Sequence, residues 1–260
     1  QAINNEIKPN YIIYDKGYKQ LNVLIAGCGT GHQILQAQRY KNAQITAIDL
    51  SLSSLSYAKR KLNELNIINV NLIQMDILEV GLLKDKFDII ECGGVLHHMY
   101  SPSKGLKVLL DSLNTNGFLK LGLYSQLARK NIVKARNYLT NKKQKATQEN
   151  IRNFRENIFL GKSPELSSLQ ESDDFYTLSS CRDLCFHEQE HRFTIPELKE
   201  TLSNHKLKFL GFLLPQSIKS IYNNHFPEDK QQTNLHNWTS FEEKYPNTFS
   251  SMFQFWVSKL

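Results

Sequence analysis

Residues 23–31 read Val-Leu-Ile-Ala-Gly-Cys-Gly-Thr-Gly, an apolar run that leads directly into three glycines at alternate positions. Four consecutive apolar residues are typical of a strand that is buried on both faces of a parallel α/β sheet. Gly27, Gly29 and Gly31 let the backbone turn sharply and approach a ligand without a Cβ in the way. The stretch therefore predicts a first strand followed by a ligand-binding loop. A glycine-rich turn without a ligand is the alternative, because glycine fingerprints are weak in isolation.

The segments that follow repeat the pattern of a strand with a polar residue or a glycine at its carboxyl end. Asp49 ends a second strand, about 20 residues after the loop, the offset at which an acidic side chain binds a ribose in doubly wound folds. A carboxylate can accept two hydrogen bonds from a cis-diol. Asp76 ends a third strand, and further strands are predicted at 87–92, 118–123, 207–214 and 252–258. The last of these is expected to run antiparallel beside the one before it.

These motifs resemble those of class I S-adenosylmethionine (SAM)-dependent methyltransferases. The resemblance implies an α/β fold with a Rossmann-like seven-stranded sheet, mostly parallel with an antiparallel final strand, plus a helical insertion. It implies SAM as cofactor and S-adenosylhomocysteine as product. In this class the acid that ends the third strand contacts adenine, and the glycines after the fourth strand lie beside the methionine portion. The cofactor residues carried over are Gly27, Cys28, Gly29, Gly31, Asp49, Leu50, Asp76, Ile77, Gly93 and Gly94.

The order of the motifs predicts one methyltransferase domain over residues 1–260. Within it we expect a SAM-binding core at 21–125, a helical insertion at 126–190 and a return to the core at 191–260, with a loop excursion at 216–251. Residues 1–20, with Tyr11, Tyr14 and Tyr18, are expected to form a lid over the cofactor or a linker. The chain does not begin with Met, so a segment cut from a longer protein is one interpretation.

Three stretches resemble a narrower bacterial group in which the domain often follows tetratricopeptide repeats. They are residues 121–130, 181–193 and 253–257. No repeat period is visible in this chain itself. The resemblance therefore implies an upstream repeat domain or a protein partner, but no particular acceptor.

Two neighbouring histidines are the candidate catalytic residues. His97 and His98 follow the fourth strand, where the transferable methyl group is expected to point. An imidazole with a pKa near neutrality could accept a proton from the acceptor. His97 is favoured over His98, since adjacent side chains diverge. The alternative is a pair of loop histidines that only shape the pocket.

Acceptor-binding residues are expected where the fifth strand ends and in the insertion. Ligands of open α/β sheets bind at the carboxyl ends of the strands. Parts of the chain outside the alternating core are expected to set the choice of acceptor. The predicted substrate-binding residues are Tyr124, Ser125, Arg129, Arg182, His187 and His191.

A second constellation in the insertion has spacings that zinc ligands also use. Its members are Cys181, Asp183, Cys185, His187 and His191. The pattern matches no recognised zinc-finger spacing. We therefore expect no metal, and packing or acceptor binding for these side chains.

The composition bears on the partners and the cellular location of the chain. The formal net charge is +7, and part of the excess lies in residues 126–148, which hold no acid. A solvated helix face is favoured there over a patch for an anionic substrate. The four cysteines suggest no disulfide scaffold. No apolar stretch approaches the roughly 20 residues that span a bilayer. Residues 1–6 lack a signal-peptide pattern. A cytoplasmic location is expected.

The fourth strand also bears on the substrate. It ends in Gly93-Gly-Val-Leu and lacks the Pro-Pro-Tyr-type tetrapeptide of methyltransferases that act on amino nitrogens, so nucleic acid is not expected as a substrate. A small metabolite with anionic or hydrogen-bonding groups is the first expectation, and a protein side chain the second.

Two other functions are alternatives to a methyltransferase, namely a non-catalytic SAM-binding interaction module and an NAD-linked dehydrogenase. The latter is disfavoured by His32, which replaces the third glycine of the dinucleotide fingerprint.

Overall fold

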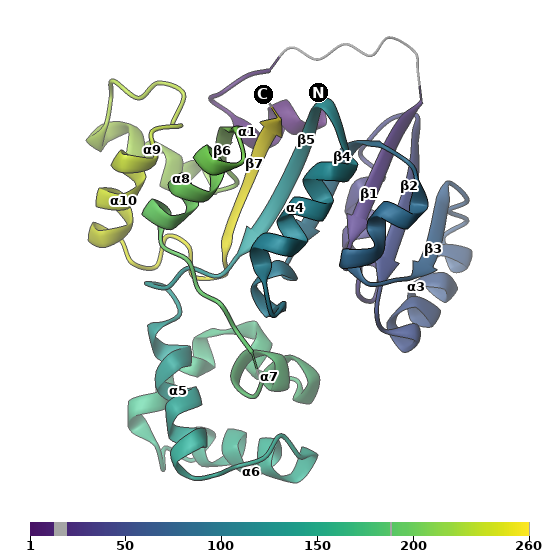
Figure 1. Cartoon of the computed structure of the whole chain (residues 1–260). Helices are drawn as coiled ribbons and strands as arrows, with labels where there is room; N and C mark the ends of the chain where they lie inside the picture. The colour runs from purple at the N-terminus through teal and green to yellow at the C-terminus, as the bar shows by residue number, and fades with distance from the viewer. Residues whose placement is uncertain (13–19, 188, 260) are drawn as a thin grey trace.

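A computed structural model describes residues 1–12, 20–187 and 189–259. They fold around a seven-stranded sheet with the order β3-β2-β1-β4-β5-β7-β6 (Figure 1). Strands β1 to β5 pair in parallel, whereas β7 runs antiparallel to both β5 and β6. The predicted fold class is confirmed. The strands are β1 (Leu21–Ala26), β2 (Ala43–Asp49), β3 (Val70–Gln74), β4 (Phe87–Gly93), β5 (Leu113–Leu123), β6 (Leu207–Phe212) and β7 (Phe253–Lys259).

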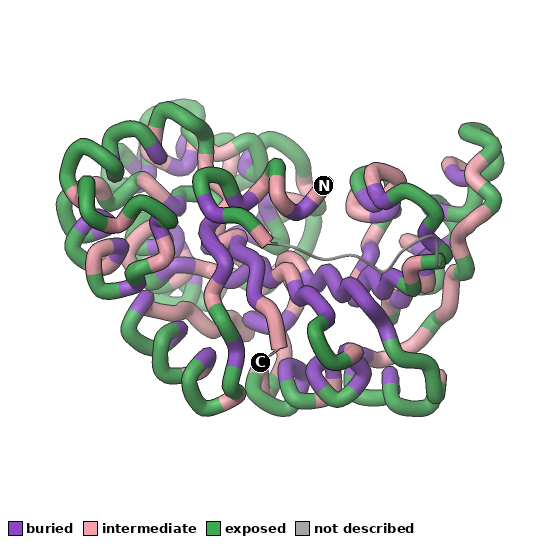
Figure 2. Tube along the Cα trace, turned by 90° about the horizontal axis from the view of Figure 1, so that it is seen from above, coloured by how far each residue is buried: buried purple, intermediate pink, exposed green. Residues whose placement is uncertain are grey.

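The apolar run of β1 is explained by its place between β2 and β4. Val23 and Ile25 are fully buried in one hydrophobic cluster, together with residues of α2 (His32–Ala37) and α3 (Leu52–Glu64). Leu24 and Ala26 are fully buried in another cluster, together with residues of α4 (Pro102–Ser112) and α8 (Ile195–Asn204). Because alternate side chains of a strand point to opposite faces, helices must cover both faces of the sheet. Figure 2 shows the buried strands between these layers.

Capping side chains fix where several helices begin. The Ser51 side chain accepts a hydrogen bond from the backbone N–H of Ser54 at the start of α3. At the start of α8, Thr194 and Glu197 form the predicted reciprocal capping box, with proline in the first turn. Both helices therefore begin at the positions that the sequence predicted.

The helical insertion forms a lobe beyond the carboxyl ends of the strands (Figure 1). It contains α5 (Lys130–Asn141), α6 (Gln148–Phe159), the 3-10 turns η3 (Pro164–Glu171) and η4 (Asp173–Phe175), and α7 (Leu178–Cys185). Its buried apolar residues form a cluster separate from the two that pack on the sheet. The insertion thus has a hydrophobic core of its own. That core is built from Ile132, Ala135, Leu139, Ile151, Phe154, Ile158, Leu166, Leu169, Phe175, Cys181, Leu184 and Cys185.

The loop excursion predicted for residues 216–251 is wrong in one respect, because two helices lie within it. They are α9 (Gln216–His225) and α10 (Leu235–Lys244). The buried ring of Tyr222 on α9 stacks on Trp238 of α10, with 3.8 Å between the ring centroids. Trp238 and Phe241 are buried anchors, as expected. Leu235, Trp238 and Phe241 stand three residues apart, a helical spacing that the sequence analysis did not use.

The N-terminal residues form α1 (Ala2–Ile7), which packs against β6 on the same face as α2 and α3. The Asn10 side chain donates a hydrogen bond to the Leu210 carbonyl oxygen over 2.8 Å. The described part of the predicted lid therefore covers the sheet near β6 and not the loop after β1. Tyr11 is exposed, and Tyr14 and Tyr18 lie outside the described residues. No helix in the described part of the chain is long and apolar enough to span a membrane.

Candidate functional site

The glycines after β1 serve two different purposes. Gly27, Gly29 and Gly31 have φ values of 79°, 51° and 99°, a region that L side chains rarely adopt. A Cβ on Gly27 would lie 2.3 Å from Cγ2 of Val95, so this glycine lets the loop pack against the segment after β4. A Cβ on Gly29 would meet no atom within 4 Å. The loop is therefore anchored at Gly27 and open at Gly29, as a ligand cradle requires.

Asp49 holds this loop from the end of β2. Its Oδ2 accepts a hydrogen bond from the Gly29 N–H and its Oδ1 accepts one from the Ser51 N–H, each over 2.8 Å. Each carboxylate oxygen has two lone pairs, so Asp49 can still bind a diol. Burial, with a smaller contribution from Asp49, raises the pKa of the Cys28 thiol to about 12. Cys28 is therefore a neutral packing residue and not a nucleophile.

The residues that end β2 and β3 combine an exposed apolar side chain with carboxylates. Leu50 is 66% exposed, although it directly follows a buried strand. The Asp76 side chain caps η1 (Ile77–Leu83) by accepting the Leu78 N–H over 2.8 Å, and Ile77 is buried. A flat aromatic base with a polar edge and a ribose fits such a set of side chains. The residues present thus fit the adenosine part of the predicted cofactor.

A glutamine that the sequence analysis missed reaches the end of β4. Gln33, in the first turn of α2, donates a hydrogen bond from Nε2 to the Gly93 carbonyl oxygen over 3.0 Å. Its Oε1 is buried and has no hydrogen-bond partner among the described residues. A Cβ on Gly94, where φ is 80°, would meet no atom within 4 Å. Gln33 therefore ties α2 to the end of β4 and keeps one buried acceptor unsatisfied, while Gly94 leaves open space after the strand.

His97 lies in η2 (Leu96–His98) and is completely buried. Its ring stacks on Tyr124 with 3.7 Å between centroids, and the Arg129 guanidinium lies 3.8 Å from the centre of the same tyrosine ring. Neither ring nitrogen of His97 has a hydrogen-bond partner of good geometry in the described structure. Burial, then the neighbouring His98 and Arg129, lower the pKa of His97 to about 3, although the Gly122 carbonyl acts in the opposite direction. In this arrangement His97 is a poor proton acceptor, so the preference for it over His98 is not supported.

His98 is the better placed of the two histidines. Its Nδ1 lies 3.0 Å from the Gln189 carbonyl oxygen, which can only accept, so a neutral His98 carries its proton on Nδ1. The lone pair is then on Nε2. Burial is the main reason that the pKa of His98 is lowered, which keeps the ring neutral. The ring also stacks on His187, with 3.9 Å between centroids.

The chain that returns from the insertion lies against the ends of β4 and β5. The His191 N–H donates to the His97 carbonyl oxygen over 2.7 Å, and the Phe193 N–H donates to that of Tyr124 over 2.9 Å. The Gln189 side chain donates to the Met99 carbonyl oxygen over 3.3 Å. The backbone of His191 thus lies against η2, and His187 reaches η2 through its stack on His98, so acceptor binding by both residues stays a prediction.

Glu190 was missed, yet it joins the two ends of the insertion to each other. Its side chain is 1% exposed and forms ion pairs with Arg129, Arg136 and Arg192. The Arg129 Nε donates to Oε1 over 3.3 Å, and its Nη2 donates to Oε2. Arg129 thus joins the predicted acceptor side as a buried residue, held between Glu190 and Tyr124. Residues so far apart in the sequence give no local signal of such a contact.

Two of the predicted acceptor residues, Ser125 and Arg182, do not contact the histidines of η2 or the Tyr124 ring in the described structure. Ser125 is buried, and its Oγ donates to Oε1 of Glu242 over 2.5 Å, so it holds α10 against the end of β5. Arg182 is exposed on α7 and donates to the Ala146 carbonyl oxygen over 2.9 Å. The structure does not bring Arg182 together with the other predicted acceptor residues, because it points to the α5–α6 connection. Within the described residues, no group of three or more His, Cys, Asp or Glu side chains could hold a metal ion.

Comparison with known proteins decides the family. Residues 18–190 match a family described as a methyltransferase domain. The chain belongs to this family. The domain has the class I SAM-dependent methyltransferase fold, and its cofactor is SAM. The glycine loop after β1 and Asp49 at the end of β2 agree with this assignment.

Three relatives of the methyltransferase domain illustrate its range. An uncharacterised protein of Synechococcus sp. is 29% identical over 203 residues, which cover 73% of this chain and 48% of that protein. Malonyl-(acyl-carrier protein) O-methyltransferase of Acetivibrio thermocellus is 29% identical over 109 residues, 42% of this chain and 37% of that enzyme. PKMT2 from Rickettsia typhi, in complex with AdoHcy, superposes with a TM-score of 0.69 at 20% identity, covering 92% of this chain and 49% of PKMT2.

The likeness to PKMT2 shows the shared fold. The methyltransferase domain spans about half the length of the Synechococcus protein and of PKMT2. The upstream repeat domain stays a prediction.

Proposed function

We propose that this domain transfers a methyl group from SAM to an acceptor with an anionic or hydrogen-bonding group. The supporting observation is the set of aromatic and basic side chains at the carboxyl ends of β4 and β5. Ligands of open α/β sheets bind at this edge. SAM, when bound, supplies a methyl group that is already activated on a sulfonium. The protein therefore has to align the acceptor and exclude water. The set comprises His97, His98, Tyr124, Arg129, His187 and His191.

The charges on the acceptor side favour an anion. Three guanidinium groups share the carboxylate of Glu190, and Asp174 and Asp183 act on Tyr124 more weakly than Arg129 does, so positive charge dominates at this wall. A carboxylate or phosphate on the acceptor would be attracted here, whereas an ammonium group would be repelled. A small anionic metabolite is therefore the first candidate acceptor, and a protein side chain is the second.

The two histidines of η2 have different parts in this proposal. His98 presents a neutral imidazole whose Nε2 lone pair is free to take a proton, because Nδ1–H is engaged by Gln189. When the acceptor group has to lose a proton, Nε2 of His98 receives it. His97 forms the wall of the site by stacking on Tyr124.

One observation favours a different function, that of a non-catalytic SAM-binding module. His97 is completely buried and Arg129 nearly so, and the segment from Gln189 to Phe193 lies across the ends of β4 and β5. A module that only binds SAM needs no open route to the methyl group. Turnover of an acceptor separates the two functions, because only an enzyme forms a methylated product.

Calorimetry with SAM and with S-adenosylhomocysteine tests the cofactor site. We expect saturable binding of both. The absence of binding by either ligand at millimolar concentration would remove the central claim. The protein is titrated as the whole chain, since Arg129 of the insertion pairs with Glu190 and packs on Tyr124 of the core.

The acceptor is sought by incubating the protein with methyl-labelled SAM and a cell extract. We expect label on a small anionic metabolite, transfer that falls at least tenfold in His98→Gln, and unchanged transfer in Arg182→Ala. Label on protein alone would overturn the choice of a small metabolite. Equal rates and equal pH profiles for the wild type and His98→Gln would exclude His98 as the proton acceptor.

A further inference from the structure

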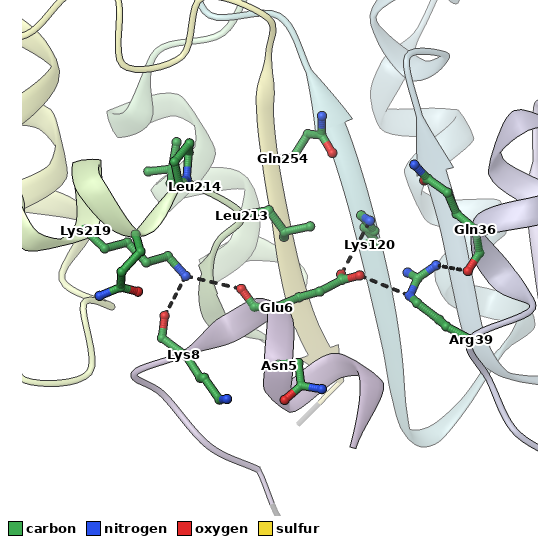
Figure 3. A pocket seen from close by; sticks show the side chains of 12 residues that line it. Asn5, Glu6, Lys8, Gln36, Arg39, Lys120, Leu213, Leu214, Lys219 and Gln254 are labelled. Carbon is green, nitrogen blue, oxygen red and sulfur yellow. Dashed lines mark hydrogen bonds and ion pairs between the residues drawn. The ribbon is translucent and has the colours of Figure 1, made fainter.

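A cavity lies on the face of the sheet that carries α1 and α2 (Figure 3). It is a groove of about 690 Å³ between α1, α2 and α9, with β5 and β7 as its floor. None of the residues that line it belongs to the predicted cofactor or acceptor sites. We call it the α1–α2 groove.

The floor of the α1–α2 groove is polar, although it lies in the middle of the sheet. Lys120 of β5 is paired in register with Glu91 of β4, and Gln254 of β7 is paired with Gly122 of β5. Central strands that helices cover on both faces are usually apolar. Glu91 is buried and binds Arg39, two residues after the end of α2, over 2.7 Å. The sequence thus places charged side chains where a covering helix would need apolar ones, which leaves the space beside α2 open.

Positive charges outnumber negative ones around the α1–α2 groove. The cations are Lys8, Arg39, Lys120 and Lys219, and the acids within or below the groove are Glu6 and Glu91. Glu6 is already engaged, since its carboxylate pairs with Arg39 over 3.0 Å and Lys120 over 3.4 Å and accepts the indole N–H of Trp256 over 2.7 Å. Four cations and two acids leave an excess of two positive charges.

Lys219 carries part of this excess in a buried position. It is only 5% exposed, and its Nζ donates to the carbonyl oxygens of Glu6 over 3.2 Å and Lys8 over 2.5 Å (Figure 3). No carboxylate of the described residues forms an ion pair with it. An ammonium group has three N–H donors, so one remains for a ligand. Burial lowers the pKa of Lys219, and a buried charge without a counter-charge is costly.

We propose that the α1–α2 groove binds a small ligand with two anionic groups, phosphate or carboxylate, which pair with Lys219 and Lys8. The volume of the groove is in the range of metabolite sites, and two negative charges would balance the excess. Charge-assisted hydrogen bonds to ammonium groups supply the affinity. This site is independent of the proposed methyl transfer, because its residues are not those of the cofactor or acceptor sites.

The test is a calorimetric titration of the whole chain with inorganic pyrophosphate and, separately, with citrate. The two probes distinguish phosphate from carboxylate. Lys8→Glu reverses a charge at the exposed rim but keeps the backbone carbonyl that Lys219 uses. The matched control is Lys199→Glu, which makes the same change in net charge. Lys199 is exposed on α8, which covers the other face of the sheet.

We expect saturable binding of at least one probe to the wild type and to Lys199→Glu, and affinity at least tenfold lower in Lys8→Glu. Lys219→Met is expected to lose binding of the probe as well, and its circular dichroism spectrum is used to check that the variant is folded. The proposal would be overturned if Lys8→Glu and Lys199→Glu lowered the affinity for the probe equally. It would also be overturned if neither probe bound the wild type at 10 times the millimolar concentration used for SAM. Competition by S-adenosylhomocysteine would also overturn it, because the anion would then occupy the cofactor site. Binding of only a hexaglutamate peptide would show a protein-docking surface instead.

Discussion

The ring of Tyr124 stacks on the imidazole of His97, with 3.7 Å between the ring centroids and 29° between the ring planes. The two residues follow neighbouring strands, β5 and β4. Tyr124 also contacts the Arg129 guanidinium, and the His97 carbonyl oxygen accepts the His191 N–H. The wall of the candidate acceptor site is therefore built as one packed unit from both strands and the insertion.

His97→Phe is expected to fold and to keep the stability of the wild type or exceed it. Phenylalanine preserves the stack on Tyr124 and removes two buried nitrogens without hydrogen-bond partners. His97→Ala, the matched comparison, leaves a cavity and is expected to cost about 2–4 kcal/mol. Urea unfolding measures both variants. A stable His97→Phe that bound SAM normally but lost all methyl transfer would contradict the packing role assigned to His97.

Asp49→Ala is expected to weaken SAM binding by on the order of 1–3 kcal/mol, because ribose hydroxyls and the Gly29 N–H lose their acceptor. Calorimetry with SAM measures the loss. Asp85→Ala removes an exposed acid elsewhere and is the control. Unchanged affinity in Asp49→Ala would show that the ribose contact has been misassigned.

Gly27→Ala is expected to lower mainly the stability of the fold, and Gly29→Ala mainly the affinity for SAM. In Gly27→Ala the new methyl group collides with Val95, and overpacking of this kind costs about 1–3 kcal/mol of stability in addition to the backbone strain. In Gly29→Ala the methyl group meets open space, so SAM affinity is expected to fall more than stability. Thermal unfolding and SAM titration separate the two effects. Val95→Ala should partly rescue Gly27→Ala, and the absence of any rescue would refute the collision.

Glu190→Gln is expected to destabilise the chain by about 3–5 kcal/mol, because three arginines lose one buried carboxylate. Unfolding in urea measures the change. Glu200→Gln, an exposed position on α8, is the control and should change stability by less than about 0.5 kcal/mol. A Glu190→Gln variant as stable as this control would mean that the arginine cluster does not hold the two ends of the insertion together.

Glu242 is expected to make stability fall as the pH rises from about 4.5 to about 7. Burial, the largest cause, raises the pKa of Glu242 from 4.5 to about 7 in the folded chain. Between these values the folded state holds a proton that the unfolded state has lost, so its contribution is full below the window and is lost above it. The slope is roughly 1.4 kcal/mol for each pH unit. Glu242→Gln should remove this slope and Glu228→Gln, at an exposed position, should retain it, as urea unfolding at pH 5, 6 and 8 would show. The same slope in Glu242→Gln would assign it to another group.

Much of the cofactor half follows from local sequence. The glycine loop, the acid at the end of β2, the capping box of α8 and the antiparallel β7 are all where the patterns predicted them. Helices α9 and α10 were missed, although Leu235, Trp238 and Phe241 have the three-residue spacing of a buried helix face, because the segment is short and mostly polar. The lid predicted for the N-terminal residues was misplaced for α1, since nothing in six residues encodes the strand against which they pack.

The sequence by itself determined which segments become buried strands and where glycine and acidic residues stand at their ends. Those features depend on alternation, β-propensity and φ preference, which act over a few residues. Only the tertiary structure decided that Glu190 gathers three arginines, that His97 is sealed while His98 keeps a free nitrogen, and that Arg182 points away. It also decided that Lys219 is buried beside the α1–α2 groove. Contacts between residues far apart in the chain depend on how whole elements pack, and no local pattern records that packing.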